Sequence, residues 1–291
     1  MTKILTALIQ MRVTADKAEN LHAAGAWIDR CAAEGAALVM LPEMFCCPYD
    51  STAFPKYAEP EGGLAWQTLS DAARRAHIYL VGGSMPEIDP AGQVYNTCYI
   101  FDPRGQQIGK HRKMHMFDID VSGGQRFRES DTLSAGNQVT VVETEFGKVG
   151  VAICYDLRFP ELARLMALQG AKILAYPGAF NMTTGPAHWE ILYRTRAMDN
   201  QVFILGCAPA RDVTAGYISY AHSLVASPWG SILAQLEDGE GRLLAEIDLD
   251  EVERVRRELP LLQHRRTDIY ELVETARAGA ENGMDHTQAL R

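Results

Sequence analysis

The chain has 291 residues, of which 47% are hydrophobic and 22% charged, and its formal net charge is -9 at pH 7. This length can bury a sizeable core, and we expect one large α/β domain. The acidic balance leaves no basic footprint for nucleic acid or anionic membrane surfaces, so we expect neither as a partner.

The first residues lead directly into the apolar stretch 4–9, without a signal-peptide cleavage pattern, and no apolar run reaches about 18 residues. We therefore expect a soluble, cytoplasmic protein. Its six cysteines are expected to be reduced, and no C-x-x-C pair indicates zinc. His111 and His115 have a ligand-like spacing, but they share a segment with three basic residues that would repel a cation, so no metal site is predicted.

The first segment alternates strand and helix patterns. A strand over 4–9 precedes a helix that Thr14 can cap and that runs to about Glu34, and 37–41 form a second buried strand. Such a βαβ unit predicts parallel strands with a ligand crevice at their carboxyl ends. Glu43 follows the second strand among apolar neighbours, which would raise its pKa toward that of a general base. The alternative is a solvated loop carboxylate.

Further along, a helix over 63–77 and a strand over 78–83 precede two hairpin strands, so the sheet is expected to be mixed. The last hairpin strand runs into a basic stretch that contains Lys110 and Lys113. A lysine held beside a thiolate would stabilise an oxyanion, whereas a solvated strand end is the ordinary alternative. Lys113 is the candidate, although spacing alone does not distinguish it from Lys110. The aperiodic stretch 121–138 is expected to be a loop over the site.

Cys154 lies where the apolar strand 149–153 stops and a helical pattern begins, with Pro160 in the first turn. A strand-to-helix elbow places a side chain at the carboxyl edge of a sheet, near backbone N–H groups and the positive end of a helix. That environment favours the nucleophilic thiolate. The alternative for Cys154 is a small buried hydrophobe.

The last part of the chain continues with a strand over 172–176, a helix that begins at Pro186, and four more strand-like runs. These complete a single domain predicted over 1–274, and the polar residues 275–291 are predicted to form a C-terminal arm.

Glu43 after one strand, Lys113 near the end of another and Cys154 at an elbow resemble the Glu–Lys–Cys triad of the nitrilase superfamily of carbon–nitrogen hydrolases. The stretches 112–120, 176–190 and 196–201 are similar to its omega-amidase branch. This resemblance extends from Ile4 to about Tyr270. It implies an α-β-β-α four-layer sandwich with mixed sheets, a homodimer that buries the elbow helices between subunits, and no cofactor.

The resemblance also implies the chemistry. It assigns Glu129 to the second glutamate that positions catalytic groups, and it implies hydrolysis of 2-oxoglutaramate or 2-oxosuccinamate to the 2-oxo acid and ammonia. Glu43 would take the thiol proton, Cys154 would form a thioester, and Lys113 with the Tyr155 backbone N–H would hold the oxyanion.

Residues expected to contact the substrate are spread over several loops. Arg196, Arg158, Arg128 and Tyr49 are candidates for its carboxylate, although an ion pair with Asp156 is an equal alternative for Arg158. The predicted substrate-binding residues are Tyr49, Phe117, Tyr155, Phe180, Thr183 and Arg196.

Two other functions stay open. An amidase for a larger amide such as deaminated glutathione, or a nitrilase, would use the same chemistry, and the variable-looking segment 121–126 would select among substrates. A catalytically idle binding protein on the same fold is a different class.

Overall fold

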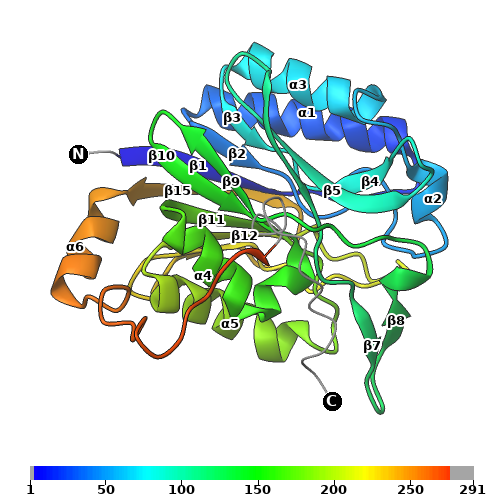
Figure 1. The fold of residues 1–291 in the computed structure, drawn as a ribbon. Coiled ribbons are helices and arrows are strands. Elements are labelled where there is room, and N and C mark those ends of the chain that lie inside the picture. Colours follow the sequence, from blue (N-terminus) through cyan, green and yellow to red (C-terminus); the bar gives the residue numbers. More distant parts are fainter. Residues whose placement is uncertain (1–2, 276–291) are drawn as a thin grey trace.

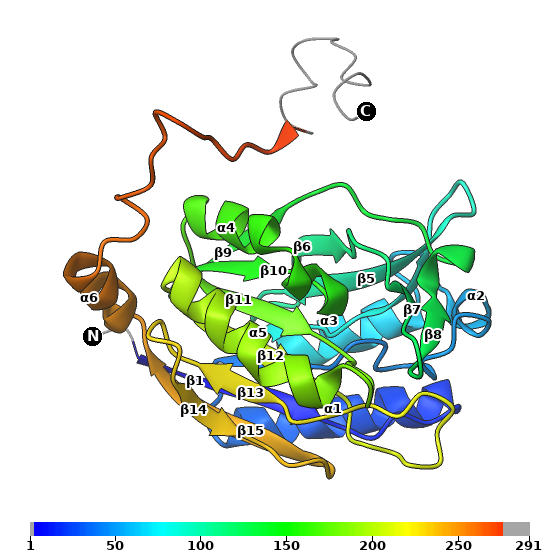
Figure 2. The ribbon, with the colours of Figure 1, turned by 90° about the horizontal axis from the view of Figure 1, so that it is seen from below.

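The computed structural model describes residues 3–275, which form two β-sheets packed face to face between two layers of helices (Figure 1). Helices α1 (Lys17–Ala33) and α3 (Leu64–Ala76) cover the outer face of the first sheet. Helices α4 (Pro160–Leu168) and α5 (Gly185–Asn200) cover the outer face of the second (Figure 2). The predicted α-β-β-α sandwich is confirmed.

The first sheet has seven strands in the order β15-β1-β2-β3-β5-β4, with β6 paired to β5. Strands β1, β2 and β3 are parallel, and the remaining pairs are antiparallel. The strands are β1 (Lys3–Gln10), β2 (Leu38–Met40), β3 (Tyr79–Val81), β4 (Met85–Ile88), β5 (Val94–Phe101), β6 (Gln107–Arg112) and β15 (Gly241–Asp248).

The second sheet has six strands in the order β14-β13-β12-β11-β10-β9, with β10, β11 and β12 parallel. Its strands are β9 (Thr140–Thr144), β10 (Gly147–Val151), β11 (Ala171–Pro177), β12 (Phe203–Cys207), β13 (Leu224–Ala226) and β14 (Ile232–Gln235). The other elements are α2 (Phe54–Tyr57), the hairpin β7 (Asp118–Asp120) and β8 (Arg126–Arg128), the 3-10 turns η1 (Glu129–Asp131) and η2 (Cys154–Arg158), and α6 (Asp250–Glu258).

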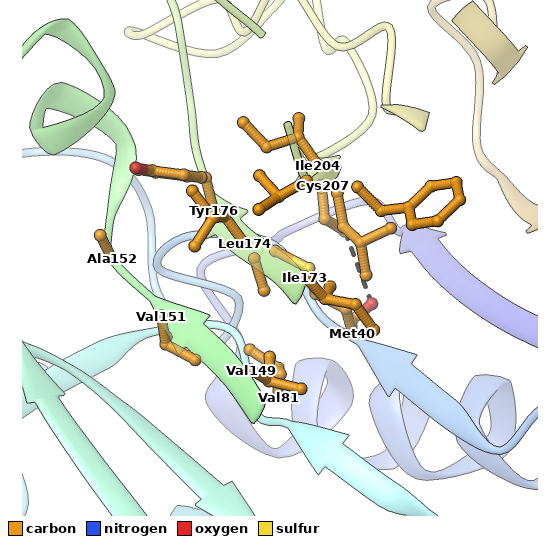
Figure 3. Close-up of a cluster of buried hydrophobic side chains, with 14 of the residues drawn as sticks. Met40, Val81, Val149, Val151, Ala152, Ile173, Leu174, Tyr176, Ile204 and Cys207 are labelled. Atoms are coloured by element: carbon orange, nitrogen blue, oxygen red, sulfur yellow. Dashed lines mark hydrogen bonds between the residues drawn. The ribbon is translucent and has the colours of Figure 1, made fainter. Parts of the chain in front are cut away.

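The main core lies between the sheets. Figure 3 shows Val149, Val151 and Ile173 of the second sheet near Met40 and Val81 of the first, and all five belong to one cluster of buried side chains. Each such aliphatic side chain contributes about 1.5–3 kcal/mol when it is fully buried. This packing fixes the ends of β2 and β10, after which Glu43 and Cys154 lie.

Two local predictions differ from the structure. Helix α1 is capped by Asp16, whose carboxylate accepts a hydrogen bond from the Glu19 N–H at 3.0 Å, and not by Thr14. The stretch 121–138 is not all loop, because it contains β8 and η1. In residues 3–275 no helix is both long and apolar enough to cross a membrane. Apart from Thr275, the arm predicted over 275–291 lies outside the described residues.

Candidate active site

Cys154 opens the 3-10 turn η2 directly after the segment that continues β10, and its sulfur is buried. Its φ of 46° is in the left-handed region, which non-glycine residues rarely adopt outside constrained sites. The loop after β11 passes beside it, because a Cβ built on Gly178 would lie 3.5 Å from the Cys154 Cα. The Ala179 backbone N–H faces the sulfur and lowers its pKa in part.

Lys113 follows β6 and joins two carboxylates in the protein interior. Its ammonium group donates to Glu43 Oε1 at 3.0 Å and to Glu129 Oε1 at 2.8 Å. All three side chains are at most 1% exposed. The structure therefore brings Glu43, Lys113, Glu129 and Cys154 together, although they are far apart in the sequence. Lys110, the other candidate, instead pairs with Glu61 and Glu87 nearer the surface.

Glu43 is held through one of its two oxygens. Besides Lys113, Oε1 accepts from Asn96 Nδ2 at 2.9 Å and lies 3.3 Å from the Tyr49 hydroxyl. Oε2 has no conventional hydrogen-bond partner among the described residues, although the Cys154 thiol is near enough to affect the Glu43 pKa. Asn96 thus orients the carboxylate, and its backbone oxygen also accepts from the Lys113 N–H at 2.8 Å.

Glu129 is fully paired, in contrast to Glu43. Its Oε1 accepts from Lys113 and from the Tyr49 hydroxyl at 2.7 Å, and its Oε2 accepts from the Phe117 N–H at 2.8 Å. Glu129 is therefore held through both of its oxygens, and it lies slightly closer to the Lys113 ammonium than Glu43 does. Although burial opposes the charge, the carboxylates of Glu129 and Glu43 raise the pKa of Lys113.

Two carboxylates and one ammonium leave one unbalanced negative charge when all are ionised. Burial, together with the charge of Glu129, raises the pKa of Glu43. Burial and the Glu43 charge also raise the pKa of Cys154 well above that of an ordinary thiol. The cluster therefore favours keeping one proton shared between Glu43 and Cys154, which suits a base and a nucleophile that exchange it.

A cavity of about 710 Å³ opens beside this cluster. Glu43, Tyr49, Phe127, Ala179 and Tyr217 contribute to its wall. Tyr217 donates a hydrogen bond to the Ala179 carbonyl, and its ring lies 4.3 Å from that of Tyr49. The cavity thus gives a small molecule access to Glu43 and to the backbone that faces Cys154.

Of the six residues predicted to bind substrate, Tyr49 lines this cavity, whereas the other five do not contribute to the wall that the described residues form. Phe117 and Phe180 are buried, and the ring of Tyr155 packs against that of Phe117. Thr183 contacts the hairpin loop, because a Cβ on Gly124 would lie 2.8 Å from its methyl carbon.

Arg196 is placed elsewhere. Its guanidinium donates to the backbone carbonyls of Leu157 at 3.0 Å and Arg158 at 3.2 Å, so it anchors the turn after Cys154 and does not face the cavity. Arg128 pairs with Asp131 at the surface. Neither is arranged to bind a substrate carboxylate.

Arg158 is not paired with Asp156, whose carboxylate binds His111 and His115. Among the described residues no carboxylate lies within 4.0 Å of Arg158. Its guanidinium lies 4.7 Å from the Phe180 ring and 5.7 Å from the Tyr155 ring, and Nη1 is 3.0 Å from His188 Nδ1. Burial lowers the pKa of Arg158, and the Cys154 and Tyr217 side chains are among the groups that raise it. Arg158 is thus a half-buried cation near the sulfur without a balancing anion.

Asn96 and Tyr217 were not predicted from the sequence. Asn96 lies in a mostly apolar hairpin strand and Tyr217 in an irregular stretch, so no local sequence pattern marks either residue as part of a site. Over residues 3–275, no three His, Cys, Asp or Glu side chains are arranged to bind a metal ion.

Comparison with known proteins gives consistent matches. The family model described as carbon-nitrogen hydrolase matches residues 5–257. Omega-amidase NIT2-A of Xenopus laevis is 49% identical over 94% of this chain and 99% of its own length. Omega-amidase NIT2 of Homo sapiens is 46% identical over 93% of this chain and 98% of its own length. The crystal structure of Saccharomyces cerevisiae Nit3, a member of branch 10 of the nitrilase superfamily, has a TM-score of 0.84 at 44% identity, covering 91% of this chain and 97% of that one.

Proposed function

The chain belongs to the carbon–nitrogen hydrolase family of the nitrilase superfamily, and on this basis we propose that it is an omega-amidase. It cleaves the terminal amide of small 2-oxo-dicarboxylate monoamides, such as 2-oxoglutaramate and 2-oxosuccinamate, to the acid and ammonia. The observation that carries the chemistry is the buried cluster in which Lys113 joins Glu43 and Glu129 beside Cys154. The near full-length similarity to proteins named omega-amidase supports the substrate class.

The reaction begins when Glu43 takes the thiol proton of Cys154 through its unpaired Oε2. The sulfur attacks the amide carbon, and the carbonyl oxygen becomes an oxyanion. Lys113, fixed by two carboxylates, and the Tyr155 backbone N–H stabilise that charge. No reorganisation of the lysine is needed at this step, because its ammonium is already oriented.

Collapse of the tetrahedral intermediate releases ammonia, which takes the proton that Glu43 carries. The acyl group stays on Cys154 as a thioester. Glu43 then removes a proton from an incoming water, the water attacks the thioester, and the acid leaves as the thiol is restored. Tyr49 and Asn96 keep Oε1 of Glu43 in place, so that Oε2 stays free to serve both half-reactions.

Although Arg158 is not part of the cavity wall that the described residues form, it is the candidate arginine best suited to bind the substrate carboxylate. It is a cation without a carboxylate partner among the described residues, and aromatic rings on two sides restrict its position. A guanidinium binds a carboxylate in a bidentate manner, which would fix the amide carbon near the sulfur. This assignment replaces Arg196, whose hydrogen bonds are already taken up by backbone carbonyls.

A second candidate substrate class has one observation in its favour. A cavity of about 710 Å³ is in the range that holds drug-sized ligands, and it exceeds what a five-carbon amide occupies. A larger amide such as deaminated glutathione is therefore the competing substrate.

We further propose that residues 1–274 form one catalytic domain, that the protein works in the cytoplasm, and that it is a homodimer. All six cysteines, each in the described part of the chain, are free thiols, as expected in a reducing compartment. Exposed apolar side chains on and beside α4 and α5 favour burial of these helices against a second copy: Leu168, Ile191, Met198 and Trp229.

The test is ammonia release from 2-oxoglutaramate, glutamine, butyramide, deaminated glutathione and a simple nitrile. The proposal expects the highest kcat/KM for 2-oxoglutaramate, because glutamine presents an ammonium group to Arg158 and butyramide lacks the carboxylate. Replacing Arg158 by Met should remove most of this preference by raising KM. Equal kcat/KM for 2-oxoglutaramate and butyramide would refute the anchoring role, and a preference for deaminated glutathione would favour the competing class.

A further inference from the structure

Asp156, two residues after Cys154, is completely buried and accepts five hydrogen bonds. Since a carboxylate can only accept, each partner must donate. Oδ1 accepts from His115 Nδ1 at 2.7 Å, the His115 N–H at 2.9 Å and the Met114 N–H at 3.2 Å, and Oδ2 accepts from His111 Nε2 at 3.1 Å and the Ile153 N–H at 3.0 Å.

The five donors come from two separate segments. Ile153 immediately precedes Cys154, whereas Met114 and His115 immediately follow Lys113. One carboxylate therefore connects the main chain beside the nucleophile to the main chain beside the lysine. The other side of Lys113 is also held, because its N–H donates to the Asn96 carbonyl and its carbonyl accepts from the Gly136 N–H, both at 2.8 Å.

The bonds to Asp156 also support the unusual backbone of the elbow. Cys154 has a φ of 46°, and such a conformation persists only where the surroundings over-determine it. The Ile153 N–H bond to Asp156 fixes the residue before the strained one. The ring of His115 stacks on that of Phe159, at 3.6 Å between centroids, so the far end of η2 is attached to the same segment.

We propose that Asp156, together with His115, is a positioning group that sets the placement of the Lys113 ammonium relative to the Cys154 sulfur. This role rests on the proposed function, in which both groups act on one carbonyl. Asp156 itself does not touch the substrate. A carboxylate that merely stabilised the fold would not require both of its oxygens to bind backbone next to the two reacting residues.

The experiment uses variants that weaken the hydrogen bonds to Asp156 to different extents. In His115→Phe the ring stack on Phe159 is kept and the donor to Asp156 is lost, whereas in His115→Asn an amide nitrogen replaces Nδ1 as donor. Asp156→Asn places an NH₂ group among five donors. The matched control is Asp102→Asn, because Asp102 is also buried and accepts from the Arg104 and Gln106 N–H groups at 2.9 Å, but in a turn away from the cluster.

The measurement is the second-order rate of Cys154 alkylation by iodoacetamide across pH, followed by mass spectrometry, alongside kcat and KM. Alkylation needs no amide substrate, so it tests the positioning role separately from the proposed function. Failure of the wild-type protein to release ammonia from any omega-amide would count against the function alone.

His115→Phe and Asp156→Asn should lower the alkylation rate at neutral pH and kcat by up to about 100-fold, the scale of a 1 Å misplacement, with KM nearly unchanged. His115→Asn should recover most of the rate, and Asp102→Asn should behave as wild type. If Asp156→Asn does not fold, the comparison of His115→Phe with His115→Asn still tests the positioning role.

A double-mutant cycle separates positioning from general stability. With Lys113 already replaced by Met, His115→Phe should lower kcat and the alkylation rate little further, because there is no ammonium left to misplace. Fully multiplicative losses in the cycle, or wild-type alkylation of His115→Phe, would overturn the proposal.

Discussion

Glu43 and Asp156 are both buried carboxylates near Cys154, but their surroundings differ in one respect. Glu43 has three polar contacts on one oxygen and none on the other, and burial raises its pKa. Asp156 has both oxygens filled. Although burial alone would raise its pKa, the hydrogen bonds from His111 and His115 keep it well below the ordinary value.

This difference separates a group that exchanges protons from one that holds geometry. A carboxylate saturated with donors stays an anion at any working pH, and so it can anchor backbone but cannot accept a proton. An under-paired carboxylate beside a like charge can take a proton readily, which a general base must do. In the proposed mechanism, placing one of each near the same sulfur would give the site both a base and a rigid frame.

The largest loss of activity is expected when the Cys154 sulfur, which both carboxylates lie near, is removed. Cys154→Ala should abolish ammonia release and leave the fold intact, since it removes one buried atom at an elbow. Cys47→Ser, which also changes the cavity wall, should keep most activity. Loss of activity in Cys47→Ser with an active Cys154→Ala would reverse the assignment.

The next largest loss of activity is expected at Lys113, whose ammonium group donates to both Glu43 and Glu129. Lys113→Met should lower kcat by at least about 100-fold, the usual result of losing one oxyanion donor, with little change in KM. Steady-state kinetics measure both. A change confined to KM would mean that the lysine binds the substrate carboxylate instead.

A Tyr49 variant tests how far activity depends on the contacts that hold Glu43 and Glu129. Tyr49→Phe keeps the ring but removes the hydroxyl bonded to Glu129 at 2.7 Å, and kcat should fall by about 10-fold, a typical cost for one hydrogen bond to a charged group. The control is Tyr79→Phe. The Tyr79 hydroxyl accepts from the Glu145 N–H away from the site, so its loss should leave kcat unchanged. Equal kcat in the two variants would contradict this role.

The smallest effect is on stability, and here the two carboxylates should have opposite signs. The depressed pKa of Asp156 stabilises the fold above the unfolded value of about 3.9, and this contribution is lost as the pH falls below it. The Tm of Asp156→Asn should therefore be lower than wild type at pH 7, with the deficit shrinking only as the pH falls below about 4, toward the depressed folded pKa.

The raised pKa of Glu43 has the reverse consequence, because its ionisation costs stability as the pH rises through the folded value. Glu43→Gln should thus melt at or above the wild-type Tm at pH 7 while losing activity. Thermal unfolding across this pH range measures both variants. A lower Tm for Glu43→Gln than for Asp156→Asn would remove the distinction between the two carboxylates.

Sequence periodicity predicted the first βαβ unit and the elbow at Cys154, because buried parallel strands and amphipathic helices leave patterns in neighbouring residues. Glu43 followed from its place after a strand. The choice of Lys113 over Lys110 and the role of Glu129 came from family resemblance, since two lysines on one strand end have the same local signal.

The supporting residues could not be read from the sequence. Asn96 reaches Glu43 across 53 positions of chain, through the order of the strands in the first sheet. His111 reaches Asp156 across 45 positions, through the packing of the first sheet on the second. Arg196 was predicted to bind substrate, but the carbonyls of the turn after Cys154 take up its donors instead. Local patterns report burial, whereas the partner of a buried polar group is fixed by tertiary structure.

The most direct test of the central claim is mass spectrometry of protein quenched in acid during turnover of 2-oxoglutaramate. The mechanism predicts an acyl group on the peptide that contains Cys154, formed as ammonia is released, and neither adduct nor turnover in Cys154→Ala. An adduct on Cys47, or continued turnover by Cys154→Ala, would contradict it.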